Sequence, residues 1–308
     1  MKKKFELANL SKNLLYCVCF SICALNLTAC DDDDENGTQG NGPAPIGIPS
    51  SVVDGVRATS MSGVDVTYNE DGTIKEAEVD GNTLVFNYAS SRAIKVDPIR
   101  SLISITSSER ESERWIASDF AFNTSGFVTA YKLKYTDTDP EFREEMNIAY
   151  TFNYNADGQM QKISMKTDGK DDEGPYSKSS EINYTYNNKV LEKIETKSNN
   201  ITYCSQTYEY TQAIKNTYNA MPLLLLPEEL ASDDCVFNVF AITGYLGNAG
   251  ANLPTAMTIK YTYPCLLYTS PSPRDNLSYT LNENKAIASY TLSRYGETMT
   301  FPCDWTNF

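Results

Sequence analysis

The sequence predicts an all-β protein, an antiparallel β-meander of repeated hairpins curled into a half-barrel or barrel. The first observation is a repeated seven-residue motif. Its positions are aromatic, any residue, aromatic, Asn, any residue, Asp or Asn, and Gly; the fullest copy is in 152–163 and a variant is in 184–194. The second is the alternation of apolar and polar residues around each turn, which is typical of half-buried strands. The third is a composition with 21 Tyr against 2 Trp, since Tyr favours strands.

The N-terminus has the features of an export signal. A basic start at Met1–Lys4 is followed by the apolar stretch Leu14–Leu27, which is short for a membrane span. The stretch ends in Leu27-Thr28-Ala29-Cys30, which resembles the lipobox of bacterial lipoproteins. This resemblance implies a signal peptide over 1–29 and a Cys30 that carries fatty acyl chains such as palmitate. An ordinary signal peptide followed by a chance cysteine is the alternative.

An acidic run and a linker follow Cys30. Asp31–Glu35 resembles the acidic export signal that sends Bacteroidota lipoproteins to the outer face of the outer membrane. A solvated charge run in a tether is the alternative. Residues 36–50 are rich in Gly and Pro without an apolar period, which indicates a linker. We therefore expect the anchor, acidic run and linker over 30–50 and a single β domain over 51–308.

The hairpins can be followed in order along this domain. Strands are expected at Val64–Tyr68 and Ile74–Val79, joined by a turn in which Gly72 accepts a positive φ. A degenerate copy at 84–94 lacks the glycine, and the motif returns at 120–126. The matching Asn residues at 123, 155 and 187 lie 32 positions apart, which suits two strands and a connection. Each hairpin has one apolar face, so sequential hairpins must pair to share a core.

One segment, Met221–Ser232, breaks the strand pattern. Pro227 followed by two glutamates is typical of the first turn of a helix. We expect one short helix or apolar plug near residues 227–232, with Leu223–Leu226 buried against the sheet.

The turns also resemble known repeats. They loosely resemble the YD repeats of secreted bacterial shell proteins. More closely, 64–308 resembles a Bacteroidota outer-membrane lipoprotein family of unknown function described as having a porin-like fold. The residues that carry this resemblance are the Tyr-x-Tyr-Asn turns and the segment Tyr245–Thr255. Although the terminal Phe308 suits a membrane barrel, counting back by twos gives no apolar face, so we expect no transmembrane segment in the mature chain.

The segment Cys265–Asp275 does not fit the pattern around it. It places two prolines where a strand or its turn is expected. Its eleven residues are those encoded by a sequencing adapter of transposase-made libraries, so we suspect an assembly artefact at 265–275. A genuine Pro-rich loop is the alternative. The strand pattern resumes at Tyr279.

Cysteine and histidine usage limits the chemistry. Outside the signal, Cys30 and the suspect segment, three cysteines remain, so three pairings are open. Export permits a disulfide, and Cys204 with Cys235 is the predicted pair, with buried thiols as the alternative. The chain contains no His, the commonest general base and zinc ligand. We expect no catalytic residues, no metal and no other cofactor.

Charge excludes one class of partner and leaves some acidic candidates. The formal charge is −14, and removal of a signal that carries +3 leaves −17, which repels nucleic acid. Acidic groups that could act as catalytic pairs or calcium ligands lie in charge-rich connections, where solvated charge is the ordinary interpretation. They are Asp137, Asp139, Glu141, Glu144, Glu145, Asp168, Asp171, Asp172 and Glu173.

The leading hypothesis is a surface-exposed outer-membrane lipoprotein, lipid-anchored and facing the cell exterior. It would be a non-enzymatic binding or structural β module for a glycan or a protein partner. Tyrosine rings can stack on sugars, although packing between strands is the ordinary role of each. The alternatives are a carboxylate-based glycan hydrolase and a barrel-like carrier of an apolar ligand.

Overall fold

The computed structural model describes most of the chain after residue 44. The described residues are 45–46, 48–79, 81–89, 100–107, 113–138, 144–171, 174–222, 225–227, 230, 234–262, 274–294 and 297–307. They belong to one compact unit, Pro43–Phe308. The signal peptide, Cys30, the acidic run and nearly all of the suspect segment lie outside the described residues.

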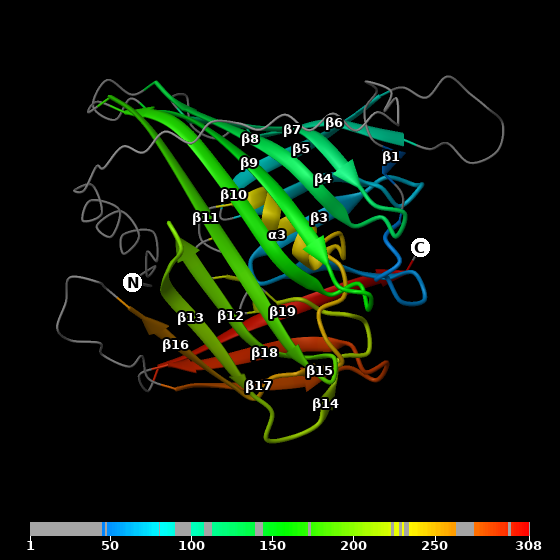
Figure 1. The fold of residues 1–308 in the computed structure, drawn as a ribbon. Coiled ribbons are helices and arrows are strands. Elements are labelled where there is room, and N and C mark those ends of the chain that lie inside the picture. The colour runs from blue at the N-terminus through cyan, green and yellow to red at the C-terminus, as the bar shows by residue number, and fades with distance from the viewer. Residues whose placement is uncertain are drawn as a thin grey trace, which may run out of the picture. The chain divides into compact units, whose positions relative to one another are not determined.

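The described strands form a closed antiparallel barrel of 16 strands (Figure 1). Each barrel strand pairs with the next one along the chain, apart from β13, which pairs with β16. The barrel closes where Cys303 of β19 lies opposite Met61 of β2. The predicted antiparallel meander is therefore confirmed, and the structure decides for the barrel rather than the half-barrel. The barrel strands are β2 (Val56–Met61), β3 (Val64–Tyr68), β4 (Ile74–Val79), β5 (Asn82–Ala89), β6 (Arg100–Ser107), β7 (Glu113–Phe122), β8 (Val128–Asp137), β9 (Glu144–Tyr154), β10 (Met160–Asp171), β11 (Gly174–Asn187), β12 (Val190–Ser198), β13 (Ile201–Glu209), β16 (Ala256–Tyr261), β17 (Asp275–Leu281), β18 (Ile287–Arg294) and β19 (Glu297–Asn307).

Three short strands lie beside the barrel strands. β1 (Pro45–Ile46) pairs with Arg100 and Ser101 at the start of β6. β14 (Ile214–Lys215) and β15 (Asn252–Leu253) form a separate two-stranded sheet. The segment between β14 and β15, residues 216–251, is called the plug below.

The repeated Asn residue builds the turns at Asn123, Asn155 and Asn282. Asn155 Oδ1 accepts hydrogen bonds from the backbone N–H groups of Asp157 and Gln159, both at 3.0 Å. Asn123 repeats this pattern at the turn before β8, and Gly158 completes its own turn with φ of +73°. These turns join odd-numbered strands to even-numbered ones, so they all lie at the same end of the barrel, called the turn end below.

The second aromatic residue of the repeat ties neighbouring hairpins together. At this position the Tyr154 hydroxyl donates a 2.7 Å hydrogen bond to the carbonyl of Val128, where β8 begins. Tyr88 and Tyr210 make the same bond to the starts of β4 and β12, and the Trp305 indole N–H makes it to the start of β18. The repeat thus has a structural reason: one aromatic residue enters the core and the next donates to the preceding hairpin.

The described helix, α3 (Cys235–Ile242), is eight residues long. It begins after Asp234, whose side chain accepts from the N–H of Phe237 as an N-cap. Leu230, inside the segment 227–232 that was predicted to be helical, is itself helical, and its carbonyl accepts a 3.1 Å hydrogen bond from Asp234 N, while 228–229 and 231–233 lie outside the described residues. For α3, the acidic cap at Asp234 before an apolar run, with Gly244 beyond it, is the start-and-stop signal in the sequence.

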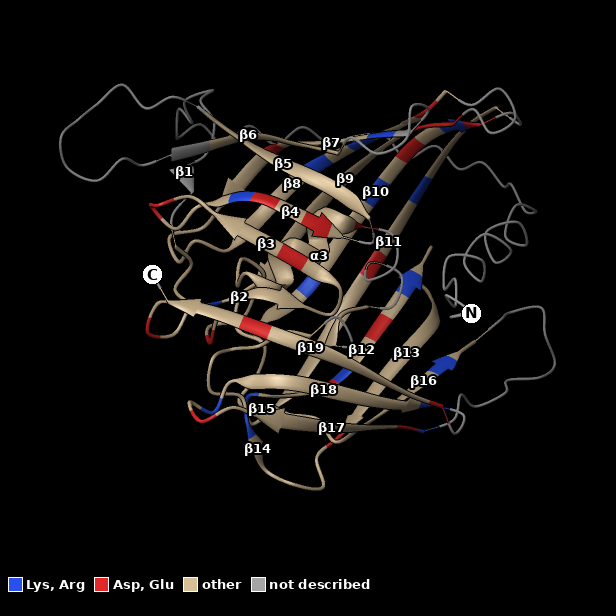
Figure 2. Cartoon of the chain, turned by 180° about the vertical axis from the view of Figure 1, so that it is seen from behind, with Lys and Arg blue, Asp and Glu red and all other residues tan. Residues whose placement is uncertain are grey.

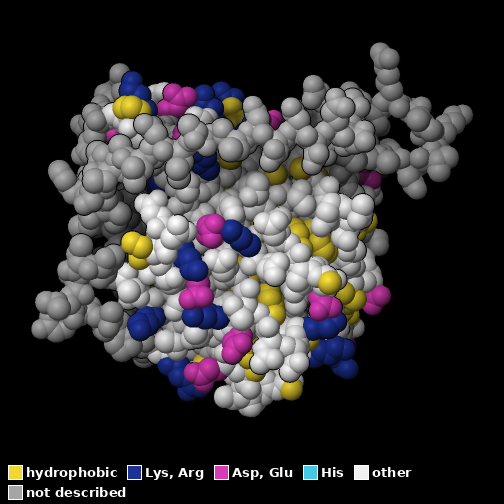
Figure 3. Space-filling model, viewed as in Figure 1, with side chains coloured by type: hydrophobic (Ala, Val, Ile, Leu, Met, Phe, Trp, Pro, Cys, Tyr) yellow, Lys and Arg dark blue, Asp and Glu magenta, His cyan; other side chains and the backbone are white. Residues whose placement is uncertain are grey.

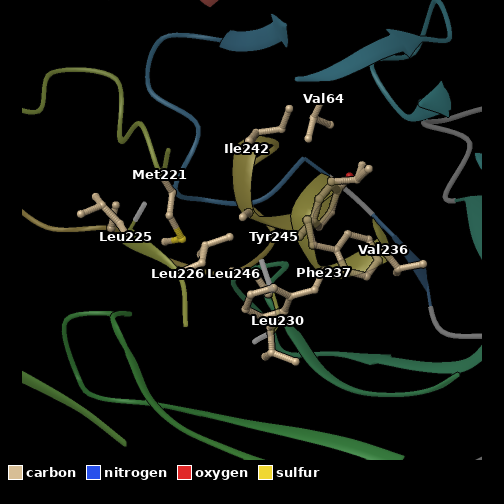
Figure 4. Packing of buried hydrophobic residues seen from close by; sticks show 14 of the residues in the cluster. Val64, Met221, Leu225, Leu226, Leu230, Val236, Phe237, Ile242, Tyr245 and Leu246 are labelled. Atoms are coloured by element: carbon tan, nitrogen blue, oxygen red, sulfur yellow. The ribbon is translucent and has the colours of Figure 1, made fainter. Parts of the chain in front are cut away.

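Helix α3 lies inside the barrel, surrounded by strands (Figures 1 and 4). Phe240 and Phe237 are fully buried. The Phe240 ring packs against Phe120 of β7 and Tyr131 of β8, with ring centroids 5.9 and 6.0 Å apart. Leu225 and Leu226 are buried as predicted, whereas 223–224 lie outside the described residues. Inward-facing strand residues and the plug therefore share one hydrophobic core.

Candidate functional site

The barrel interior is filled where the structure describes it. Two recesses, one beside Trp305 and one beside Trp115, have volumes of about 0 and 10 Å³, the larger being room for about one water molecule. A carrier of an apolar ligand requires a lined cavity of several hundred cubic ångströms. The described interior thus gives no support to the carrier hypothesis.

A buried carboxylate holds the plug to the wall. Asp234 is 2% exposed, and its Oδ2 accepts a 2.7 Å hydrogen bond from the hydroxyl of Tyr131 on β8. Burial raises the pKa of Asp234, while the hydrogen bonds from Phe237 N–H and the tyrosines act in the opposite direction. Burial next to this carboxylate also raises the pKa of Tyr131. Since these donors satisfy both carboxylate oxygens, the role of Asp234 is structural.

A glycine-containing strap, residues 244–251, crosses the turn end. Its backbone bonds three successive turns: Tyr245 O accepts from Val128 N, Asn248 N donates to Gly158 O, and Ala251 N donates to Lys189 O, over 2.8–3.0 Å. A Cβ at Gly247 would lie 2.4 Å from Gly158 O, so only glycine permits this approach. The segment that carried the sequence resemblance therefore binds the β7–β8, β9–β10 and β11–β12 turns at this end of the barrel.

The outer wall of the barrel is polar. Outward-facing lysines form ion pairs across neighbouring strands, as in Lys132–Asp119 at 2.8 Å and Lys134–Glu145 at 2.9 Å. Figure 2 marks charged residues of both signs along the strands, and Figure 3 shows charged side chains on the face in view with hydrophobic ones between them. The large hydrophobic side chains that are exposed among the described residues are few and dispersed. They are Ile48, Val85, Ile201, Leu281 and Met299.

Aromatic residues gather at the end of the barrel opposite the turn end. We call this group, Trp115, Tyr135, Glu144 and Tyr176, the rim. Its members point inward, in alternation with buried residues on the same strands, and its three aromatic side chains are half-buried rather than buried. The rings of Trp115 and Tyr135 lie 4.2 Å apart between centroids. The Tyr176 hydroxyl donates a 2.7 Å hydrogen bond to Glu144 Oε1, and its ring covers Gly169.

The rim was not predicted as a site. Trp115 and Tyr135 lie in ordinary alternating strands, and they become partners because β7 and β8 pair with Trp115 opposite Tyr135. Burial, and then the neighbouring Glu144, raise the pKa of Tyr176, so it remains a hydrogen-bond donor at neutral pH. The rim combines aromatic faces, a hydroxyl and a carboxylate, which is a surface suited to polar ligands that also have apolar faces.

The carboxylates considered for hydrolysis do not form a pair on the described strands. Glu144 and Glu145 are adjacent on β9, so they point to opposite faces: Glu144 accepts from Tyr176 inside, and Glu145 pairs with Lys134 outside. Lys134 holds the pKa of Glu145 below its usual range. Asp171 Oδ1 caps the N–H of Gly174 at the hairpin tip. Glu141, Asp172 and Glu173 lie outside the described residues.

The acidic residues considered as calcium ligands also fail to come together on the described strands. Asp168 and Asp171 are three positions apart on β10 and so face opposite sides of the sheet, and Asp139 is not described. Among the described residues, no three His, Cys, Asp or Glu side chains come together in a way that could hold a metal ion.

The predicted disulfide is not formed in the structure. Cys204, Cys235 and Cys303 are each present as the thiol. Cys204 lies on β13 opposite Tyr261 of β16, whereas Cys235 begins the helix and faces a recess lined by Trp115 and Leu133 of β7 and β8. The fold thus places the two cysteines against different parts of the wall. Burial raises the pKa of Cys303 to about 12.

These features define a class of protein, a closed antiparallel barrel with a polar wall, a packed interior and an internal plug. Among solved structures, the chain is similar to a porin-like protein from Bacteroides vulgatus ATCC 8482, with a TM-score of 0.53 and 15% identity over 80% of this chain and 98% of that one. A porin-like protein from Bacteroides uniformis ATCC 8492 aligns with a TM-score of 0.45 and 16% identity over 87% of this chain and 100% of that one. No protein-family model and no curated protein matches the chain.

The first of these likenesses supports the porin-like fold expected from the sequence, at an identity that speaks for the fold alone. In the part of the chain that the structure covers, no helix has both the length and the apolar character that a membrane crossing requires.

Proposed function

We propose that the protein is a lipid-anchored outer-membrane lipoprotein, exposed on the cell exterior, that binds an extracellular glycan through the rim without catalysing a reaction. The observation that carries the proposal is the aromatic group at the rim, in a barrel whose described interior is full. The anchor is the diacylated Cys30 of the lipobox, and the acidic run after it supports export to the cell surface. A protein ligand at the same rim is the other outcome of the test below.

The polar wall supports a barrel that stands in water rather than in lipid. A barrel that crosses a membrane presents an outward apolar band about 25 Å tall. Here outward positions of neighbouring strands carry ion pairs such as Lys134–Glu145, and alternate positions on β3 and β4 expose Asp65 and Lys75. Placing these charges in hydrocarbon is strongly unfavourable, so the acyl chains, and not the wall, provide the membrane attachment.

The rim supports a sugar as the ligand. The C–H faces of a sugar ring pack on aromatic rings, and Trp115 and Tyr135, which pack on each other with centroids 4.2 Å apart, each keep an outer ring face for such a contact. Sugar hydroxyls both donate and accept hydrogen bonds, which suits the hydroxyl of Tyr176 and the carboxylate of Glu144. Trp115 contacts Tyr135 and Tyr176 contacts Glu144, so a ligand would meet two preorganised pairs of side chains.

The test is binding of the mature chain, residues 30–308, to a glycan array, followed by titration of a bound glycan with the Trp115→Ala variant. We expect wild-type binding and its loss in the variant, while Trp305→Phe, at the far end of the barrel, keeps wild-type affinity. Binding that is unchanged in Trp115→Ala would refute the rim as the site. A negative array together with specific capture of one surface protein would replace the glycan with a protein ligand.

The anchor has its own test. Labelled palmitate fed to producing cells should appear in the wild-type protein and be missing from Cys30→Ser. Equal labelling of both would show that Cys30 is not the lipidated residue.

A further inference from the structure

The chain enters the barrel at one defined end. Ser50 N donates to Ser125 O at 2.8 Å, and Ser51 Oγ donates to Gly244 O at 2.6 Å. Pro49 packs so closely on the turn at Gly126 that a Cβ there would lie 2.9 Å from its Cα. Because these contacts involve a turn and the strap, residues 49–51 are fixed to the turn end.

The length of chain between the anchor and the barrel decides which end of the barrel can lie next to the membrane. Fourteen residues separate Cys30 from Pro45, and a flexible tether of this length spans about 20 Å on average and about 50 Å when fully extended. The longest strand, β11, has 14 residues, and at a rise of about 3.3 Å and a usual tilt the barrel is about 35 Å high. The tether would have to span about 35 Å along the wall before the rim could reach the lipid surface, well above its average span of about 20 Å.

From this geometry we propose that the turn end is the membrane-facing surface of the protein and that the rim points away from the cell. This inference rests on the proposed lipid anchor at residue 30. The partner of the turn end is the lipid headgroup surface.

The turn end is suited to lie next to headgroups. Its tips carry both signs of charge, with Lys189 paired to Asp157 at 2.7 Å and with Glu283 close to Lys285 in sequence. A mixed surface is not strongly repelled by an anionic or a zwitterionic bilayer. The strap hydrogen-bonds three turns at this end, whereas the rim lies at the other end.

The two tryptophans allow a direct test, because the sequence contains only two and they lie at opposite ends of the barrel. Trp305 donates to Ile287 O beside the 282–286 turn, and Trp115 belongs to the rim. The mature chain with a His-tag at residue 30 would be bound to vesicles that contain nickel-chelating lipid and dansyl-headgroup lipid. Energy transfer from each tryptophan would be measured alone, in the Trp115→Phe and Trp305→Phe variants.

Transfer from Trp305 should exceed that from Trp115 several-fold, since the height of the barrel separates them. Equal transfer, or more from Trp115, would overturn the proposed orientation. The exposed Ile48 and Ile201 provide a second pair that does not require either tryptophan to be replaced. Ile48→Trp at the turn end should raise transfer above wild type, and Ile201→Trp in the opposite hairpin should not. The energy-transfer experiment uses a His-tag in place of the acyl anchor, so its result does not depend on lipidation. Failure of palmitate labelling would therefore count against the proposed function and not against the measured orientation.

Discussion

Replacing Phe240 by Ala tests whether the plug and the wall form one core. The Phe240 side chain is 0% exposed and its ring lies within 6.5 Å of five aromatic rings, measured between centroids. Those rings are on β5, β7, β8 and the strap: Phe86, Phe120, Phe122, Tyr131 and Tyr245. Truncation of a buried Phe costs about 3–5 kcal/mol, and loss of several ring contacts places this site at the upper part of the range.

The assay is thermal and urea unfolding of the mature chain, followed by circular dichroism. A loss of about 4 kcal/mol should lower Tm by about 8–16 °C for a domain of this size. The matched control is Val85→Ala, an apolar residue on the outside of β5 that is 37% exposed, which should change stability by no more than about 0.5 kcal/mol. If Phe240→Ala and Val85→Ala unfold at the same temperature, the helix does not support the barrel and the description of a shared core is wrong.

Three further outcomes are expected. Burial raises the pKa of the Asp234 carboxyl, so the folded protein holds the carboxyl proton more tightly than the unfolded chain does. Wild type should therefore lose stability relative to Asp234→Asn as the pH rises above about 4. A Tm difference between the two that is constant from pH 4 to pH 8 would contradict this. Tyr154→Phe removes the hydrogen bond to Val128 and should cost about 0.5–1.5 kcal/mol in urea unfolding, and no loss would show that the bond is dispensable. Iodoacetamide at pH 8, read by peptide mass spectrometry, should label the half-buried Cys235 well before the buried Cys303, whose pKa is raised to about 12, and equal rates would contradict their placement.

The hairpin repeat made the sheet predictable because its information is local. Asn155 and Gly158 specify a turn through hydrogen bonds that span only four residues, and alternation specifies which face of each strand is apolar. Sequential pairing then follows from short turns. A helix was also expected near residues 227–232, where Leu230 is helical, while α3 after the Asp234 cap was not separately predicted.

The candidate site could not be predicted in the same way. Trp115 and Tyr135 are 20 positions apart in strands that look like every other strand, and only the register between β7 and β8 puts their rings together. Tyr176 and Glu144 meet across β10, which neither residue reveals in the sequence. The Cys204–Cys235 pairing stays a prediction, because proximity in a barrel depends on strand order and register rather than on spacing along the chain.

The sequence alone determined the strands, the turns and the apolar face of each hairpin, since all three depend on contacts within a few residues. Only the tertiary structure decided that the ribbon closes, that the apolar side faces inward onto a plug, and that aromatic residues are left half-buried at one end. Closure requires β19 to meet β2, more than two hundred residues earlier in the chain. That meeting depends on the accumulated twist and stagger of all the strands between them, which no short stretch of sequence specifies.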